Sequence, residues 1–461
     1  MFYSDSVSES ETLFLCIFVV AIYFTLLFLL KKKGLFEKYN LSFYGPLLMW
    51  KTEKGKNLIK RIASRTRLWN WFGFAGILVC FVTMMLMLLL LIWNVSLLQY
   101  IPREEWHNIP GAEMVIAIPG INPILPLGYT ILGLVVAVVV HEFSHGTLSV
   151  VGKIRIKSLG ILTFIFPVGA FVEPDEEALK KMETRKRMKV FAAGPTMNLA
   201  AAFACIVVIS FVFMPFVHPS EGAVVGYTLE GFPAEEIGLK SWSIITEING
   251  SRIADEKDFS EAMVETKAGQ TVPIIYHTLD GDVYEKRVTL ADKYSFTNRT
   301  MDKGKGFLGV GITSILKDDL LVFKNPFSGF KNFFIRFYGA PFIGFFTGYN
   351  PLVEPYTHYY KIGGVFSLLP SNVFWMFVNA FYWIFWLNFA VGVFNALPIV
   401  PLDGGYLFQD GFEMLLRKTR SGMSKEKREN VVKAAAFSIS LFTLFLVLAP
   451  LLFKYLGPLL F

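Results

Sequence analysis

The stretch VVVHEFSHG, residues Val138–Gly146, places two histidines and a glutamate directly after an apolar run that begins near Ile131. Histidines at positions i and i+4 lie above one another on one face of a helix. His141 and His145 can therefore offer two imidazole nitrogens to one tetrahedral zinc ion, with Glu142 beside the water that completes such a site. The motif predicts a zinc-binding helix, and the apolar run before it predicts that this helix lies in a membrane.

The composition of the whole chain supports the membrane assignment. Of its 461 residues, 54% are hydrophobic and 46 are phenylalanine, and the mean hydropathy is +0.49. A net charge of +7 is compatible with a nucleic-acid partner, but the basic residues cluster beside apolar segments, as they do on the inner face of a membrane. We therefore expect an integral, multi-pass protein of the cell membrane with the lipid bilayer as a partner and no nucleic acid.

Six apolar runs are each long enough to cross about 30 Å of hydrocarbon as a helix. They comprise residues 12–30, 71–93, 125–150, 190–217, 373–397 and 434–453. Residues 333–349 could form a seventh, but Arg336 and several glycines interrupt that run, and we interpret it as interfacial or re-entrant. The expected fold is a polytopic α-helical membrane protein with about six transmembrane helices.

Charge orients these helices. The connection 31–67 carries eleven lysines and arginines against Glu37 and Glu53, so it is expected on the cytoplasmic side. With six crossings, the basic connections 153–189 and 417–433 also fall inside, whereas 94–124, with Arg103 as its one cation, falls outside. The polar stretch 220–312 is then extracytoplasmic.

The zinc interpretation competes with a simpler one, in which neighbouring groups satisfy two ordinary helix histidines. Ionisable side chains at membrane depth cost several kcal/mol and persist mainly where they face a functional site. This cost favours zinc ligation by His141 and His145.

A zinc site needs a third protein ligand and one open position. The remaining histidines all fall in stretches that the charge bias places outside: His107, His218, His277 and His358. The stretch FNALPIVPLDGG, Phe394–Gly405, supplies Asp403 just before the inner loop, on a helix that two prolines and two glycines break. Irregular backbone at that depth is tolerated only where it lines protein or a wet cavity. Asp403 is therefore the predicted third ligand, and an ordinary Asp-Gly turn is the alternative.

Two smaller segments carry strand signals. Residues 220–312 contain alternating runs and turns, and the sequences GFPAEEIGL and IITEING within them resemble the PDZ family. The run SLGILTFIFPVGAFV, Ser158–Val172, is too short to span and is broken by glycines and a proline, so a re-entrant strand pair is expected. Its edge could hold an unwound substrate as an added strand, although a simple surface hairpin is an alternative.

Taken together, HEFSH, AAGPTMN and FNALPIVPLDGG in this order, with a PDZ-like insert between the corresponding spans, resemble the site-2 protease family of intramembrane zinc metalloproteases. The resemblance implies zinc (Zn2+) as the cofactor, His141, His145 and Asp403 as its ligands, Glu142 as the catalytic acid and base, and Asn198 and Asn395 as helpers around the substrate backbone. The Asn198 amide could equally tie two helices together.

The implied organisation has five segments. Residues 1–111 form two helices with a basic cytoplasmic loop, 112–219 the first part of the protease core with the HEFSH helix, hairpin and GPxxN helix, 220–312 the extracytoplasmic PDZ-like domain, 313–369 an interfacial linker, and 370–461 the LDGG part of the core with the C-terminal helix.

The expected function is intramembrane zinc endopeptidase, which cuts transmembrane segments of membrane proteins in regulated intramembrane proteolysis, with an upstream protease as a further candidate partner. Two alternatives remain open at this point. A zinc transporter would usually show internal repeats and polar residues on several spans. A catalytically inactive membrane scaffold would act through its PDZ-like domain.

Overall fold

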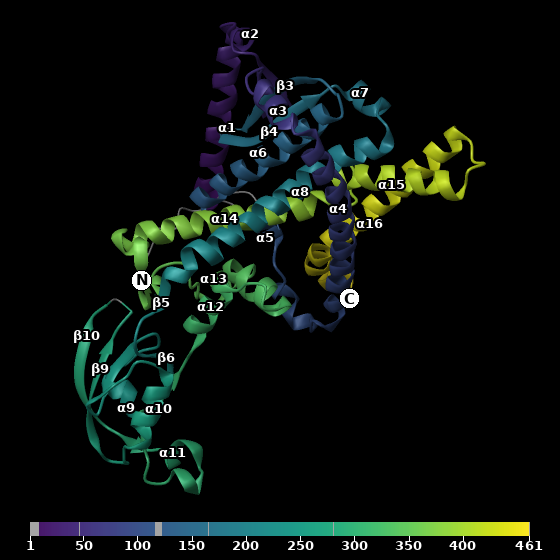
Figure 1. Ribbon diagram of the computed structural model, residues 1–461. Helices are drawn as coiled ribbons and strands as arrows, with labels where there is room; N and C mark the ends of the chain where they lie inside the picture. Colours follow the sequence, from purple (N-terminus) through teal and green to yellow (C-terminus); the bar gives the residue numbers. More distant parts are fainter. Residues whose placement is uncertain (1–8, 46, 116–121, 165, 280, 461) are drawn as a thin grey trace. The chain divides into compact units, whose positions relative to one another are not determined.

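The computed structural model describes residues 9–460 except for residues 46, 116–121, 165 and 280 (Figure 1). The chain forms two compact units. The first comprises Met1–Cys205 and Trp383–Phe461, and the second comprises Ile206–Tyr382. The second unit is therefore an insertion between the two halves of the first.

Long apolar helices make up most of the first unit, and two of them, α8 and α14, continue into the second. Its helices are α1 (Glu9–Lys32), α2 (Leu35–Lys38), α3 (Lys56–Ala63), α4 (Thr66–Leu97), η1 (Leu98–Tyr100), η2 (Arg103–Asn108), α5 (Ala112–Val115), α6 (Leu127–Val151), α7 (Glu176–Lys181), α8 (Thr184–Val208), α14 (Ser371–Asn395), α15 (Asp403–Thr419) and α16 (Lys425–Leu460). Runs of valine and phenylalanine stay helical here because a helix satisfies every backbone group within its own segment, which lipid requires.

Five helices among the described residues are long and apolar enough to cross a membrane: Thr66–Tyr100, Leu127–Val151, Thr184–Phe216, Ser371–Asn395 and Lys425–Gly457. They coincide with the second to sixth runs expected from the sequence. The first run, 12–30, lies within α1, which is not among the five, and most of the α1 side chains up to residue 20 lie outside the described residues. The chain is a polytopic helical membrane protein, while six crossings and their orientation stay predictions.

A four-stranded antiparallel sheet completes the first unit. Its strands are β1 (Leu41–Tyr44), β2 (Leu47–Thr52), β3 (Ile156–Phe164) and β4 (Phe166–Pro174), in the order β1-β2-β3-β4. The hairpin expected at 158–172 is β3–β4. Strands β1 and β2 lie in the basic connection 31–67, where no strands were expected. Gly160 lies on β3 between β2 and β4, and a glycine is needed there because a Cβ would overlap the Trp50 carbonyl and the Phe171 ring.

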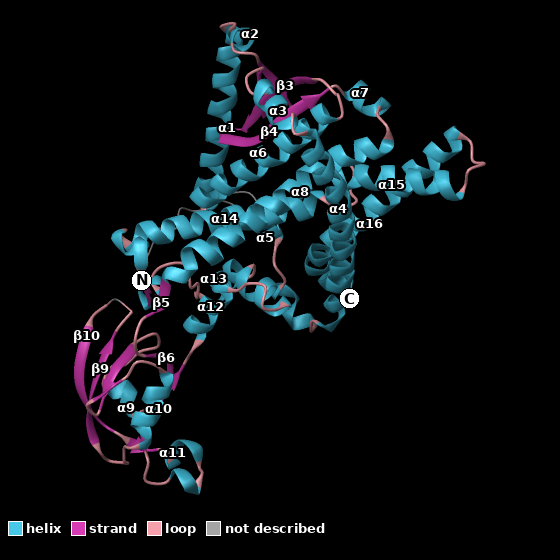
Figure 2. Cartoon of the chain, viewed as in Figure 1, coloured by secondary structure: helices cyan, strands magenta, loops and turns pink. Residues whose placement is uncertain are grey.

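The PDZ-like domain of the second unit is a sheet with two helices packed on it (Figure 2). Its sheet order is β10-β9-β7-β6-β13, with β8 paired to β7. The elements are β6 (Ala223–Thr228), α9 (Pro233–Glu236), β7 (Ile244–Ile248), β8 (Ser251–Arg252), α10 (Glu256–Val264), β9 (Thr271–His277), β10 (Val283–Thr289) and β13 (Val310–Ile312). Alternate residues of β9 are buried, as the period of two in a strand requires. They join a core that includes Ile245, Ile248 and Leu308.

The rest of the second unit consists of short elements: η3 (Ile209–Phe213), η4 (Met214–Phe216), β5 (Val217–Pro219), β11 (Ala291–Asp292), α11 (Tyr294–Thr297), η5 (Thr300–Asp302), β12 (Gly306–Phe307), α12 (Ile315–Lys324), η6 (Asn332–Phe337), α13 (Ala340–Thr347), η7 (Tyr356–Tyr359), β14 (Tyr360–Ile362) and η8 (Gly364–Leu368). Residues 333–349 thus overlap η6 and include α13, of 6 and 8 residues, each too short to cross about 30 Å alone. The buried Asp319 carboxylate accepts hydrogen bonds from Arg336 and from the Tyr349 hydroxyl, which ties these segments to α12.

Candidate functional site

Helix α6 positions the two histidines of the HEFSH motif one turn apart. Their rings meet edge to face, with centroids 4.7 Å apart, and their Nε2 atoms are separated by 3.1 Å. Both side chains are largely buried. The i, i+4 spacing of the sequence therefore brings two nitrogen atoms to one point, as expected.

Asp403 is carried to the same point by a break between two helices. Helix α14 ends at Asn395 and α15 begins at Asp403, and the segment between them turns irregularly. Gly404 and Gly405 follow closely on this turn, where a Cβ would overlap the backbone of Ala396 and Ile399. Only glycine allows that approach, so the Asp-Gly-Gly sequence is what lets the carboxylate enter the site.

The three side chains form one cluster. An Asp403 carboxylate oxygen lies 3.0 Å from His141 Nε2 and 3.2 Å from His145 Nε2. The three candidate ligand atoms all lie within 4.8 Å of one another, and the side chains are 11–16% exposed. Two imidazoles and one carboxylate are a donor set that suits zinc, and three protein ligands leave a fourth position open.

The other nitrogen of each imidazole is already engaged. His145 Nδ1 lies 2.7 Å from the Val190 carbonyl, and His141 Nδ1 lies 2.6 Å from the Asn198 side-chain oxygen. Because a carbonyl oxygen only accepts, both Nδ1 atoms carry the proton and donate. This tautomer leaves the two Nε2 lone pairs facing Asp403, which is the arrangement that orients metal-ligating histidines.

Asn198 connects three helices rather than lining an open surface. Its side chain is fully buried, and its amide nitrogen donates to the Ala137 carbonyl at 2.8 Å and to the Asn388 side-chain oxygen at 3.0 Å. Asn388 in turn donates to the Ile384 carbonyl. These contacts favour the helix-tying interpretation of Asn198 over direct contact with substrate.

Two asparagines of α14 near the site, Asn388 and Asn395, have contacts that the sequence did not predict. Asn388 was missed, and the only signal for it was a polar residue inside the apolar run 373–397. Asn395, expected near the substrate, is half-buried and donates to the Val391 carbonyl of its own helix at 3.0 Å. A role for Asn395 in substrate binding stays a prediction.

Glu142 faces the hairpin. Its carboxylate accepts a hydrogen bond from the Val172 backbone N–H of β4 at 3.2 Å, and the residue is half-buried. The next residue of β4 is also acidic, but it is held differently. A hydrogen bond from the Ser158 hydroxyl, helped by Lys51, lowers the pKa of Glu173. Glu142 is thus next to the histidines, and a single backbone N–H group positions its carboxylate.

Gly194, in the AAGPTMN stretch, lies directly against the cluster. A Cβ at this position would overlap Nε2 of His145 and both Cε1 and Nε2 of His141. The glycine therefore keeps clear the space onto which the two Nε2 atoms open.

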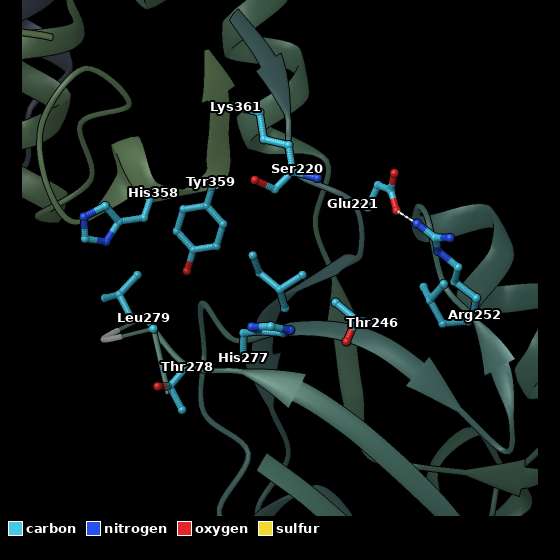
Figure 3. Close-up of a pocket in the computed structure, with 13 residues that line it drawn as sticks. Ser220, Glu221, Thr246, Arg252, His277, Thr278, Leu279, His358, Tyr359 and Lys361 are labelled. Atoms are coloured by element: carbon cyan, nitrogen blue, oxygen red, sulfur yellow. Dashed lines mark hydrogen bonds and ion pairs between the residues drawn. The ribbon is translucent and has the colours of Figure 1, made fainter. Parts of the chain in front are cut away.

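A separate cavity of about 420 Å³ lies in the second unit, between the PDZ-like sheet and the strands β5 and β14 (Figure 3). His277 and His358 line it, and Glu221 forms an ion pair with Arg252 at its edge. In the described part of the chain, one group of three or more histidine, cysteine, aspartate or glutamate side chains is close enough to hold a metal. It consists of His141, His145 and Asp403.

Comparisons with known proteins point to one family. A model described as Peptidase family M50 matches residues 129–445, more than half of the chain. The uncharacterized protein MJ0971 of Methanocaldococcus jannaschii is 25% identical over 395 residues, which cover 84% of each chain. Zinc metalloprotease Rip1 of Mycobacterium tuberculosis is 26% identical over 302 residues, or 55% of this chain and 70% of that protein. Zinc metalloprotease RasP of Shouchella clausii is 25% identical over 282 residues, or 61% and 62%.

Among solved structures, the PDZ domain of an SdrC-like protein from Listeria monocytogenes is similar to part of the chain. The two share 21% sequence identity, and the TM-score is 0.18. The matched part covers 22% of this chain and 95% of the solved domain.

Replacing Gly194 with alanine is expected to weaken zinc binding, because the new methyl group would displace at least one imidazole. Disturbing the surroundings of metal ligands typically lowers affinity on the order of 10–100-fold. Zinc affinity should be measured by competition with a chelator. Gly128→Ala is the matched control, since a Cβ at Gly128 on the same helix as the histidines meets nothing within 4 Å. Equal affinity in the two variants would contradict the steric argument.

Replacing Asn388 with alanine is expected to lower zinc affinity about 10-fold, because Asn198 loses one of the contacts that orient it toward His141. Asn379→Ala is the control, since Asn379 is a buried asparagine of the same helix that donates to the Leu352 carbonyl in the second unit. Zinc affinity and thermal stability should be measured for both variants. If both lose stability and zinc affinity to the same extent, Asn388 has no specific role in positioning His141.

Proposed function

Because the chain belongs to peptidase family M50 and is a zinc metalloprotease, we propose that it hydrolyses peptide bonds inside the transmembrane segments of other membrane proteins. The observation that carries this proposal is the place of the three clustered side chains. His141 and His145 lie on a helix apolar enough to cross a membrane, and Asp403 follows another such helix after a break of seven residues, 396–402. This position favours a substrate peptide bond that lies within the bilayer.

The residues at the cluster also argue against the two alternative functions. A zinc transporter would have no use for Glu142, which stands beside the histidines without being part of the three-residue cluster. An inactive scaffold would not need a cluster with one open ligand position.

We assign His141, His145 and Asp403 as the zinc ligands. When bound, zinc would act as a Lewis acid and lower the pKa of a coordinated water to about 7. Glu142 takes the proton from the attacking water and passes it to the leaving amide nitrogen, which is general base and then general acid catalysis. The hydrogen bond from Val172 N–H occupies one carboxylate oxygen and leaves the other for this proton transfer.

The sequence supports a cut near the cytoplasmic face. His145 and Asp403 both precede basic connections that the charge bias places inside. Cleavage would then release the cytoplasmic part of a single-span substrate, as in regulated intramembrane proteolysis, and the cell membrane is the proposed location.

The PDZ-like domain has a different proposed role. The charge bias predicts the zinc site near the inner face and this domain on the outer face, so we assign the domain no part in hydrolysis. We assign it as a filter that excludes substrates with bulky outer domains, so that an upstream protease has to trim them first. Its buried core lies within residues 223–308, so the domain has a core of its own.

Replacing Glu142 with glutamine is expected to abolish hydrolysis of a membrane-helix substrate while zinc stays bound, because the carboxylate transfers protons and is no ligand. His145→Ala and Asp403→Ala are expected to lose both zinc and activity. Zinc per chain and cleavage by purified protein should be measured together, with chelator added to the wild type as a control. Full zinc occupancy in Asp403→Ala would place the third ligand elsewhere, and loss of zinc in Glu142→Gln would overturn its role.

Replacing residues 220–312 with a short linker is expected to keep zinc and to allow cleavage of untrimmed substrates. The contacts on either side of the excised domain survive, since β5 still pairs with β14 and the Ser210 hydroxyl still donates to the Phe323 carbonyl. Cleavage of matched trimmed and untrimmed substrates should be compared. A deletion variant that stays active but still strictly requires trimming would rule out the filter, and product ends in the outer half of the substrate helix would rule out the assigned depth.

A further inference from the structure

A small apolar groove lies in the first unit between α6 and the hairpin β3–β4. Its volume is about 150 Å³, and its walls are apolar residues of α6 on one side and Ile161, Gly169 and Ala170 on the other. Val139 and Ile161 remain 40% and 38% exposed. The groove is therefore open to an apolar group from outside the chain.

The groove lies beside the part of α6 that precedes Glu142. Val138 and Val139 line it four and three residues before Glu142, so all three share one face of α6. On the opposite wall, Ala170 lies two residues before Val172, whose N–H binds Glu142. A side chain placed at the Val138 and Val139 end of the groove would lie about one helical turn from Glu142.

The groove is also bordered by a strand edge. Strand β4 is the last in its sheet, and Ala170 and Val172 stand opposite Ile161 and Leu159 of β3. The Val172 N–H points at Glu142, away from β3, and the alternation of an antiparallel ladder turns the N–H and C=O of Ala170 the same way. An extended peptide can add to such an edge through its main chain while a neighbouring pocket takes one of its side chains.

We propose that this groove is a substrate subsite for one apolar side chain close to the scissile bond, which rests on the proposed function. Its volume suits one residue, since an apolar cavity of about 150 Å³ holds a benzene-sized group. Leucine and phenylalanine fit it, alanine leaves it partly empty, and aspartate would lose its hydration without a partner. The site therefore selects a large apolar residue at one position of the extended substrate.

The first test uses a series of membrane-helix substrates in which one residue near the cut is alanine, leucine, phenylalanine or aspartate. At one position the wild type is expected to prefer leucine or phenylalanine over alanine about 10-fold in kcat/KM. Val139→Phe fills the groove and is expected to remove this preference without changing zinc content. Val82→Phe makes the same change at a 49% exposed position of α4 and is expected to keep the preference.

The second test needs no turnover. The variant carries Glu142→Gln and Val139→Cys, and its own cysteines are replaced by alanine. With a mild oxidant added to accept the two electrons and two protons, the introduced cysteine is expected to form a disulfide with substrates whose single cysteine stands at one position or two residues from it. Val82→Cys is expected to show no such pattern.

Two outcomes would overturn the subsite: a wild-type enzyme that cleaves with no preference at any position, and crosslinks from Val139→Cys that match those from Val82→Cys, as expected if lipid fills the groove. Failure of the proposed function would appear separately, as the absence of chelator-sensitive cleavage by the wild type.

Discussion

An ionisable side chain buried among apolar helices needs a partner, and in this protein three of them are partners of one another. The Asp403 carboxylate meets the Nε2 atoms of His141 and His145, and the site depends on bringing them together from two separate helices. An uncompensated charge in that setting costs several kcal/mol of free energy. Because pairing lowers this cost, the side chains are more stable together than each would be alone. A metal ion that accepts all three donors relieves that cost further.

Around the cluster, the polar contacts continue outward in a chain. Asn198 holds His141 in the tautomer that frees Nε2, and it is itself fixed by Ala137 and Asn388, so that α6, α8 and α14 meet at one amide. Gly194 lies one turn before Asn198 on α8 and keeps the space in front of both imidazoles clear. The AAGPTMN stretch thus acts on the cluster through positioning and shape, while the candidate ligand atoms come from other helices.

Sequence patterns predicted the parts of this arrangement that depend on local spacing. The i, i+4 histidines, the helix break at the Asp-Gly-Gly sequence and the hairpin at 158–172 all follow from the period of a helix or strand and from the limits of proline and glycine. Contacts between distant segments could not be predicted in that way. Strands β1 and β2 are recognisable only once β3 is beside them, and Asn388 looks like any polar residue in a long apolar helix until Asn198 faces it. The contact of Glu142 with Val172 depends on the same long-range packing.

The separation of the cluster along the chain has a consequence for biosynthesis. His145 and Asp403 are 258 residues apart, and the whole second unit is made between them. A ribosome that has delivered α6 to the membrane has supplied two imidazoles and a glutamate, but the carboxylate that completes the set arrives only after the inserted unit and α14. On the proposed assignment of Asp403 as the third zinc ligand, the nascent chain stays inactive until the second unit and α14 have been synthesised, so newly inserted neighbours do not meet an active protease before then.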